Sequence, residues 1–238
     1  MNAKIITIEG TDCSGKETQS KLLIKKLEKL GKKVKVYSFP TYETGTGRIV
    51  GECYLGKGCK SFFEEGAPNV DPLISSLYFA ANRRDTFLKE IEKELDKNDY
   101  IILDRYTTSN MGHQGGKGKT KKEKDKILEF LETLEFELLE LPRPDMVIFL
   151  HMPYEAACFL KQNREELDDN EKSEKHLREA EANYLYICKK YNWEYIECVK
   201  NTKITSKDDI RSIEEINEEI FNKVLKAKVK EKTKMTRY

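Results

Sequence analysis

Short runs of β-branched and apolar residues alternate with longer amphipathic segments along most of the chain. Five such runs have the length and composition of buried strands: residues 5–8, 34–39, 100–103, 146–150 and 194–198. Because helical segments separate these runs, the strands have to pair in parallel through crossover helices. We therefore predict an α/β fold in three layers, with a five-stranded parallel sheet and helices on both of its faces.

Local signals predict where several helices begin and end. Gly31 follows the first amphipathic segment and suits a helix C-cap, and Pro153 opens a helix that we expect to run to about Gln162. Ser206 and Asp209 match a capping box, which predicts the start of a C-terminal helix.

Other segments have less regular patterns. Residues 115–124 look like a basic, glycine-rich connection, and residues 165–172 like an acidic connection between two helices. No internal repeat and no linker rich in Pro or Ser divides the chain. We therefore predict a single domain over residues 1–238, in which residues 206–238 form a C-terminal helix and a basic tail.

Composition narrows the classes of function. The 238 residues include 43 Lys and Arg against 42 Asp and Glu, a net charge of +1, which argues against nucleic-acid binding as the main function. Apolar runs do not exceed five residues, so we expect no membrane-spanning segment, and the N-terminus lacks a signal-peptide pattern. Six irregularly spaced cysteines favour reduced thiols and a cytoplasmic location.

Residues 10–16, Gly-Thr-Asp-Cys-Ser-Gly-Lys, match the phosphate-binding pattern G-x-x-x-x-G-K. The pattern follows a predicted strand and opens a helix, so that backbone N–H groups and the helix N-terminus can hold phosphates. It predicts the P-loop NTPase fold and a nucleoside triphosphate site made of Gly10, Cys13, Ser14, Gly15, Lys16, Glu17 and Thr18. Glu17 stands where a Ser or Thr hydroxyl usually ligates Mg²⁺. Its carboxylate either ligates the metal, directly or through water, or points away from it.

Three further clusters suit a second, nucleotide-like substrate. Residues 39–42 and 104–114 begin where predicted strands end, and the carboxyl ends of strands line the ligand crevice of open α/β sheets. Residues 78–84 lie on a predicted helix, to which that argument does not apply. Phe79 and Arg83 lie four residues apart on one helix face, where the ring can stack on a base and the guanidinium can donate to a base oxygen.

Each of these side chains also has a purely structural interpretation. A helical Phe79 is usually part of a core, and a lone Arg83 usually makes a surface salt bridge. Arg105, at the end of a strand, suits a phosphate clamp because its planar fork binds oxyanions through two nitrogens.

Together, in their order along the chain, the motifs resemble those of the thymidylate kinase family. The resemblance runs from Ile5 to about Cys198 and rests on Glu9-Gly-Thr-Asp12-Cys-Ser-Gly-Lys16, Phe39-Pro40 with Tyr54-Leu-x-Gly56, Phe79-Ala-x-Asn82-Arg83, Asp104-Arg105-Tyr106-x-x-Ser109-Asn110 and Leu141-Pro-Arg-Pro-Asp145. It implies a phosphotransferase that moves the γ-phosphoryl group of ATP to dTMP, giving dTDP and ADP in dTTP biosynthesis, with Mg²⁺ as cofactor. It also implies a short lid at about residues 161–175 and a homodimer.

The resemblance further implies roles for individual residues. Asp12 would bond the sugar 3′-hydroxyl, Phe79 would stack on thymine, Arg83 would bond its carbonyl edge, and Arg105 would hold the acceptor phosphate. The expected dTMP-binding set is Asp12, Phe39, Tyr42, Phe79, Asn82, Arg83, Arg105, Ser109, Asn110 and His113. The expected catalytic set is Lys16, Asp12, Arg105 and Arg164.

Some positions depart from the family pattern. Tyr42 replaces an Arg that contacts the acceptor phosphate in many members, which would leave more of that task to Arg105. His113 replaces a Tyr beside the 2′ face of the sugar, so the preference among dTMP, dUMP and related monophosphates stays open. Arg164, the only Arg of the lid, either closes over the ATP phosphates or stacks on adenine. Glu171 is expected to act on Mg²⁺ through water.

Other functions remain open at this stage. The same fold serves deoxynucleoside kinases and kinases of other pyrimidine monophosphates. Glu17 and the Arg-poor lid leave room for a nucleotide-binding protein without catalysis. Residues 117–126 and the tail could bind nucleic acid as a side function.

Overall fold

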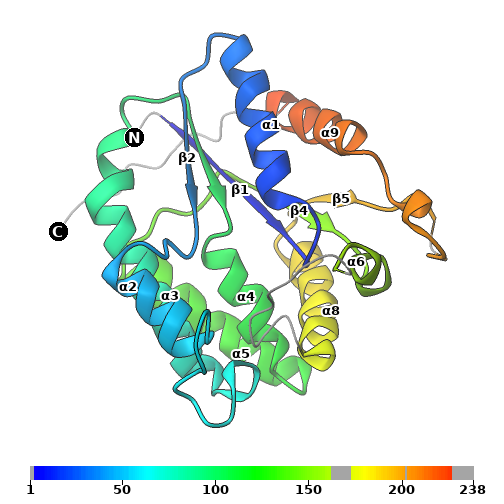
Figure 1. Cartoon of the computed structure of the whole chain (residues 1–238). Helices are drawn as coiled ribbons and strands as arrows, with labels where there is room; N and C mark the ends of the chain where they lie inside the picture. Colours follow the sequence, from blue (N-terminus) through cyan, green and yellow to red (C-terminus); the bar gives the residue numbers. More distant parts are fainter. Residues whose placement is uncertain (1–2, 162–172, 202, 227–238) are drawn as a thin grey trace.

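The five predicted strands form one sheet. The computed structural model describes residues 3–161, 173–201 and 203–226. Its strands are β1 (Lys4–Gly10), β2 (Val34–Ser38), β3 (Tyr100–Asp104), β4 (Met146–His151) and β5 (Glu194–Glu197), in the spatial order β2-β3-β1-β4-β5 (Figure 1). Every neighbouring pair is parallel, with Ile6 of β1 opposite both Ile102 of β3 and Met146 of β4. The predicted five-stranded parallel sheet is confirmed.

Helices cover both faces of this sheet, as Figure 1 shows. The α-helices of the described residues are α1 (Lys16–Lys29), α2 (Gly45–Arg48), α3 (Pro72–Thr86), α4 (Thr107–Gly116), α5 (Lys121–Glu132), α6 (Tyr154–Lys161), α8 (Glu174–Lys190) and α9 (Ile213–Lys226). Wider helical turns continue α2 over Ile49–Tyr54, α3 over Phe87–Ile91 and α5 over Thr133–Leu138.

Alternate residues of the strands face two separate cores. Ile6 and Ile8 of β1 pack with α1, α6 and α9, whereas Ile5 packs on the opposite face with the helical turns that follow α3. Phe149 of β4 contributes to a further cluster with α4, α5 and α8. Because side chains of a strand point alternately to its two sides, this division confirms the predicted three-layer arrangement.

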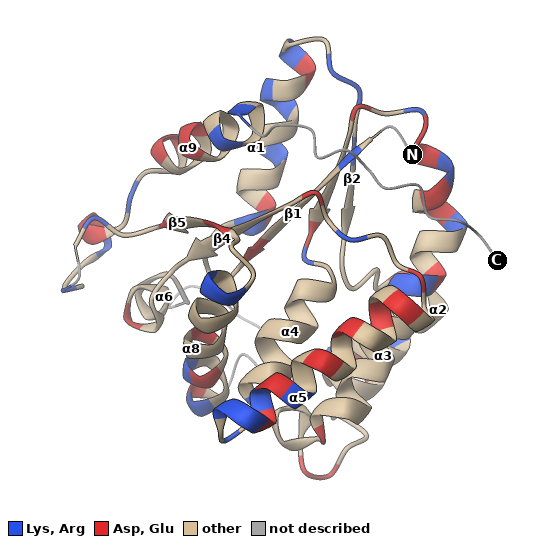
Figure 2. Cartoon of the chain, turned by 180° about the vertical axis from the view of Figure 1, so that it is seen from behind, with Lys and Arg blue, Asp and Glu red and all other residues tan. Residues whose placement is uncertain are grey.

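Lys and Arg residues are mixed with Asp and Glu residues along helices α1, α5, α8 and α9, whereas α4 contains none of them (Figure 2). This explains how a chain rich in charge can have a net charge of +1 and still bury an apolar core on each side of the sheet. No helix in the described ranges is long and apolar enough to cross a membrane.

The predicted helix ends are confirmed in part. Gly31 has φ 73° and its N–H donates to Glu28 O at 2.8 Å, so it ends α1 as a left-handed C-cap. The helix opened by Pro153 begins at Tyr154 and is described as far as Lys161, so the predicted end at Gln162 lies outside the described residues.

The capping box at Ser206 and Asp209 is present, but it begins only the single turn Lys207–Asp209. The chain is then extended at Ile210, which bridges to Val199, so the C-terminal helix α9 begins later than predicted, at Ile213. Contacts outside the segment therefore stop the helix that the local signal predicts.

The basic, glycine-rich connection predicted at residues 115–124 is present but shorter, at residues 117–120. Helix α4 runs through Gly116, and α5 begins at Lys121 behind a capping box made by Thr120 and Glu123. A Cβ on Gly112 would lie 2.1 Å from the Tyr184 ring. The glycines of α4 therefore allow close packing against α8.

Candidate active site

The loop between β1 and α1 has the geometry that the sequence pattern predicts. Gly15 has φ 77° and caps α1. A Cβ on Gly10 would lie 2.4 Å from Ser14 Oγ and 2.7 Å from Leu150 O, so only glycine fits there. Thr11 Oγ1 donates to Met152 O at 2.6 Å and accepts from Met152 N at 2.9 Å, which ties the loop to the end of β4.

Lys16 lies buried inside this loop. Its Nζ donates to Gly10 O at 3.0 Å and to Thr11 O at 2.9 Å. Burial, and after it the charge of Arg105, lowers the pKa of Lys16 to about 8, while neighbouring carboxylates oppose that shift. The loop thus holds the Lys16 ammonium group, and a nearby polyanion such as a nucleotide phosphate would stabilise its charged form.

A cavity opens beside the loop at the carboxyl edge of the sheet. Its empty volume is about 720 Å³ when its open mouth is included. All of the expected dTMP-binding residues line it: Asp12, Phe39, Tyr42, Phe79, Asn82, Arg83, Arg105, Ser109, Asn110 and His113. Leu55, Tyr106, Gln114 and Leu177 also line it and were not predicted as site residues.

Helix α3 reaches this cavity although it does not begin at a strand end. Asn82 of α3 accepts from the backbone N–H of Thr41 at 3.0 Å and donates to the hydroxyls of Thr41, Thr44 and Thr46. These bonds hold the segment after β2 against α3. Residues 78–84 therefore join the two strand-end clusters around one cavity, which the strand-end argument alone did not predict.

Arg105 emerges from β3 in a strained backbone conformation. Its φ is 63°, a left-handed value that is uncommon for a residue with a side chain, and its N–H donates to Ile8 O. Its nitrogens lie 3.8 Å from Glu9 Oε1 and 3.9 Å from Asp12 Oδ1. Burial alone would lower the pKa of Arg105, but Glu9, then Tyr184 and Asp12, outweigh it and raise that pKa. Arg105 is thus a permanent cation between the cavity and the phosphate loop.

Glu9 is a fully buried carboxylate beneath this site. The sequence pattern predicted no role for its side chain. It accepts from the hydroxyls of Thr108 and Ser109 at 2.9 and 2.7 Å, and from Tyr184 OH at 3.2 Å. These bonds satisfy a buried charge and fix the anion that faces Arg105.

Tyr42 and His113, which differ from the residues usual in the family, each contact a side chain that the sequence did not predict as a neighbour. Lys57 Nζ lies 4.1 Å from the centre of the Tyr42 ring, so a cation lies on the face of that neutral side chain. His113 stacks on His176 of α8 with a Nδ1–Nε2 distance of 3.3 Å. Burial, then the charge of the other imidazole, lowers the pKa of His113, and burial lowers that of His176 to about 4. Both rings are therefore neutral at pH 7.

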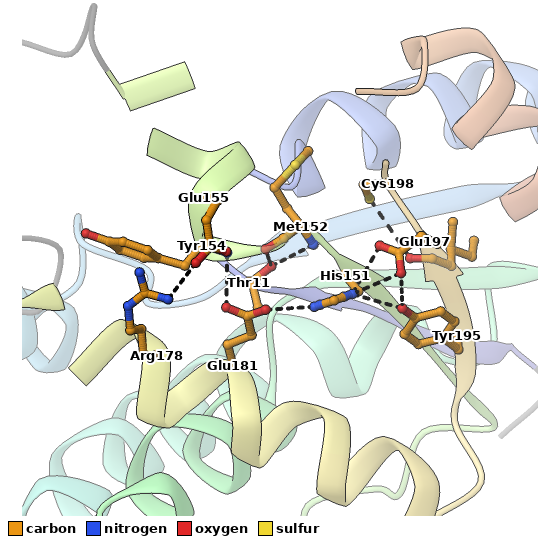
Figure 3. Close-up of polar contacts among 11 residues, drawn as sticks. Thr11, His151, Met152, Tyr154, Glu155, Arg178, Glu181, Tyr195, Glu197 and Cys198 are labelled. Atoms are coloured by element: carbon orange, nitrogen blue, oxygen red, sulfur yellow. Dashed lines mark hydrogen bonds and ion pairs between the residues drawn. The ribbon is translucent and has the colours of Figure 1, made fainter. Parts of the chain in front are cut away.

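The buried His151 and two partly buried carboxylates join the two helices on either side of the expected lid to the sheet (Figure 3). His151, at the end of β4, donates from Nε2 to Glu181 of α8 at 2.9 Å and from Nδ1 to Glu197 of β5 at 3.1 Å. The second oxygen of Glu181 accepts from the N–H of Tyr154, the first residue of α6. Burial opposes protonation, but the bonds to Glu181 and Glu197 outweigh it and raise the pKa of His151 to about 9.

The expected metal and lid residues are described only in part. Arg164 and Glu171 lie outside the described residues, as does most of the expected lid at 161–175. The Glu17 carboxylate pairs with Lys21 and its side chain is 73% exposed. Within the described part of the chain, no group of three or more His, Cys, Asp or Glu could hold a metal ion. The carboxylates whose charges act on Lys16 are those of Asp12, Glu9 and Asp104, and carboxylates of this kind can bind Mg²⁺ through water when phosphates supply its other ligands.

A phosphate-binding loop and a cavity lined by aromatic, polar and charged side chains thus meet at the carboxyl edge of a parallel sheet, with Arg105 between them. This arrangement defines a phosphotransferase of the nucleoside monophosphate kinase class.

Comparison with known proteins identifies the family within that class. The family model described as thymidylate kinase matches residues 8–220. The thymidylate kinase of Schizosaccharomyces pombe is 30% identical over 215 residues, covering 88% of each chain. That of Plasmodium falciparum is 30% identical over 227 residues, covering 95% of this chain and 91% of that protein. The chain belongs to the thymidylate kinase family.

Solved structures of the family have the same fold. The thymidylate kinase of Candida albicans superposes with a TM-score of 0.69 at 21% identity and covers 94% of this chain and 92% of its own. That of Ehrlichia chaffeensis superposes with a TM-score of 0.61 at 23% identity and covers 94% and 100%.

Proposed function

We propose that this chain transfers the γ-phosphoryl group of ATP to dTMP, giving dTDP and ADP in dTTP biosynthesis. One observation carries the proposal: a single cavity is lined by Asp12 of the phosphate loop, the Phe79 ring and the Arg105 guanidinium. A nucleoside monophosphate with its base at Phe79 extends its phosphate toward Arg105 and the loop. That arrangement brings acceptor and donor together, which is most of what phosphoryl transfer requires.

On the acceptor side, each residue has a distinct task. Phe79 stacks on the base, and Arg83 and Asn110 bond its edge. Asp12 bonds the sugar 3′-hydroxyl, and Arg105 holds the acceptor phosphate. Around them, Phe39, Tyr42, Asn82, Ser109 and His113 complete the walls.

On the donor side, the loop binds the ATP phosphates through its backbone and Lys16. Gly10, Cys13, Ser14 and Gly15 form the concave backbone, and Glu17 and Thr18 follow in the first turn of α1. Glu17, after release from Lys21, and Glu171 would hold Mg²⁺ through water. The bound metal would supply positive charge against the phosphates.

Arg164 closes over the ATP phosphates and adds a second catalytic cation beside Lys16, because the variable positions of the loop, residues 11–14, contain no basic residue. The variant Arg164→Ala tests this assignment by steady-state kinetics. We expect a lower kcat; an unchanged kcat with a higher KM for ATP would instead assign Arg164 to adenine.

The substrate assignment is tested with a coupled ADP-release assay on dTMP, dUMP, dCMP and thymidine. We expect the highest kcat/KM with dTMP. Preferred turnover of thymidine would indicate a deoxynucleoside kinase. ATP binding without turnover of any acceptor would indicate a nucleotide-binding protein without this activity.

We also propose that the chain is a single kinase domain that works as a homodimer in the cytoplasm. An apolar stripe on α3 and the turn after it supports the dimer, because its members are between 39% and 50% exposed: Leu73, Ile74, Leu77 and Leu88. The six cysteines are all free thiols, which suits a reducing compartment.

A further inference from the structure

Arg83 and Glu135 form a buried ion pair at the wall of the acceptor cavity. Arg83 Nε donates to Glu135 Oε2 at 2.5 Å, and Nη2 donates to Oε1 at 2.6 Å. The side chains are 2% and 0% exposed. This fork fixes the plane of the guanidinium, and Nη1 has no bond to any other residue in the described part of the chain.

The same carboxylate also orients Asn110. Asn110 Nδ2 donates to Glu135 Oε1 at 2.9 Å and to the carbonyl of Ser76 at 3.2 Å. Both partners can only accept, so the amide nitrogen has to face them and the orientation of this amide is determined. The Oδ1 of Asn110, which has no partner within the described ranges, is left for the cavity that Asn110 lines.

Stability alone does not account for this pair. Two apolar side chains of similar volume stabilise a core about as well as a buried ion pair, since they avoid the cost of desolvating two charges. A buried carboxylate that holds two cavity-lining side chains instead suits a role in orientation.

We propose that Glu135 is the positioning residue for base selection, an inference that rests on the proposed function and deepens it. By holding Arg83 and Asn110, it makes the cavity wall present one N–H donor beside one carbonyl acceptor. A 4-oxopyrimidine, thymine or uracil, offers the complementary pair, an O4 acceptor beside an N3–H donor. A 4-aminopyrimidine offers an amino donor beside an N3 acceptor, so both contacts are mismatched.

The variant Glu135→Gln tests the proposal, with Glu137→Gln as matched control. Glu137 is exposed in the same helical segment, so its variant makes the same charge change away from the cavity. In Glu135→Gln, the amide NH₂ group is a donor that faces the N–H groups of Arg83 or Asn110 and cannot accept from them. The side-chain amide of Asn110 can then rotate by 180° and exchange its oxygen and nitrogen.

The measurements are kcat and KM for dTMP, the Ki of dCMP as a competitor, and the KM for ATP. For Glu135→Gln we expect the preference for dTMP over dCMP to fall by about tenfold or more. The change appears in the KM of dTMP and the Ki of dCMP, while the KM for ATP and all constants of the control stay within about twofold.

If Glu135 had a merely structural role, its replacement would raise the KM of dTMP and the Ki of dCMP by the same factor, and that result overturns the proposal. Should Glu135→Gln fail to fold, Glu135→Asp keeps the charge but retracts the carboxylate, so it cannot hold both partners. A preference unchanged in folded Glu135→Asp overturns the proposal as well.

The proposed function can fail separately. If the wild-type protein does not phosphorylate dTMP, the kinase assignment is refuted. Calorimetric binding of dTMP and dCMP to wild type and variants then still decides whether Glu135 sets the preference.

Discussion

His151→Gln removes a buried cation that joins β4, β5 and α8. Nε2 of His151 faces the Glu181 carboxylate, and Nδ1 faces Glu197 together with the Tyr195 hydroxyl, which itself donates to Glu197, so the folded state favours the charged ring. The His151 side chain is 10% exposed, but that of Glu197 is 39% exposed, so solvent screens the contact to Glu197 in part. Gln can replace one of the two bonds and neither charge interaction. The loss should therefore appear as a change in how stability depends on pH.

The magnitude follows from the pKa of His151. The pKa is raised from 6.5 to about 9, so the folded state holds a proton that the unfolded state loses. This contribution to the free energy of unfolding is complete below pH 6.5 and is lost as the pH rises through about 9. At about 1.4 kcal/mol per pH unit, the upper bound is on the order of 3 kcal/mol, and solvent screening at the exposed Glu197 reduces it.

Urea unfolding of wild type and His151→Gln between pH 6 and 9.5 measures the effect. The variant's free energy of unfolding must be subtracted from that of the wild type at each pH. Lys16 and Lys117 have pKa values lowered to about 8, so in both proteins they make stability rise with pH above that value, opposite to the effect of His151. We expect the wild-type advantage to shrink by at most about 3 kcal/mol over this range, and by at least about 1 kcal/mol. An advantage that stays constant with pH would refute the assignment of a charged His151.

Three further predictions concern the site and the assembly. Arg105→Ala lowers kcat/KM for dTMP by about 10²–10³-fold, the usual cost of losing one oriented donor, whereas the exposed Arg143→Ala changes it less than about twofold in the same assay. Gly10→Ala forces a methyl group to within 2.4 Å of Ser14 Oγ, so calorimetry should show no ATP binding, and normal affinity would contradict this loop geometry. Leu77→Glu places a charge on the apolar stripe of α3 and should give a monomer in light scattering; an unchanged dimer would exclude that face as the interface.

The fold could be predicted largely because its signals are local. A β-branched run such as residues 146–150 and the glycines of residues 10–16 carry their preferences within a few residues, and both predictions are confirmed. Predictions failed where distant contacts overrode local ones. The capping box at Ser206 begins only one turn because the bridge between Val199 and Ile210 extends the chain.

The candidate site divides in the same way. Arg105 could be assigned because a strand end and a motif mark it. Glu135 lies between Leu134 and Phe136 in a charged amphipathic segment, where nothing in the pattern separates it from its exposed neighbours. His176 likewise gives no signal until α8 packs against α4 and brings it to His113.

By itself, the sequence determined the parallel sheet, the phosphate loop and the family to which the chain belongs. Each depends on residue types at fixed short spacings, which a single chain displays directly. Only the tertiary structure decided which carboxylates face which cations: Glu9 under Arg105, Glu135 behind Arg83, and Glu181 and Glu197 around His151. A charge can be buried only with a partner, and such partners are brought together by packing between elements far apart in the chain.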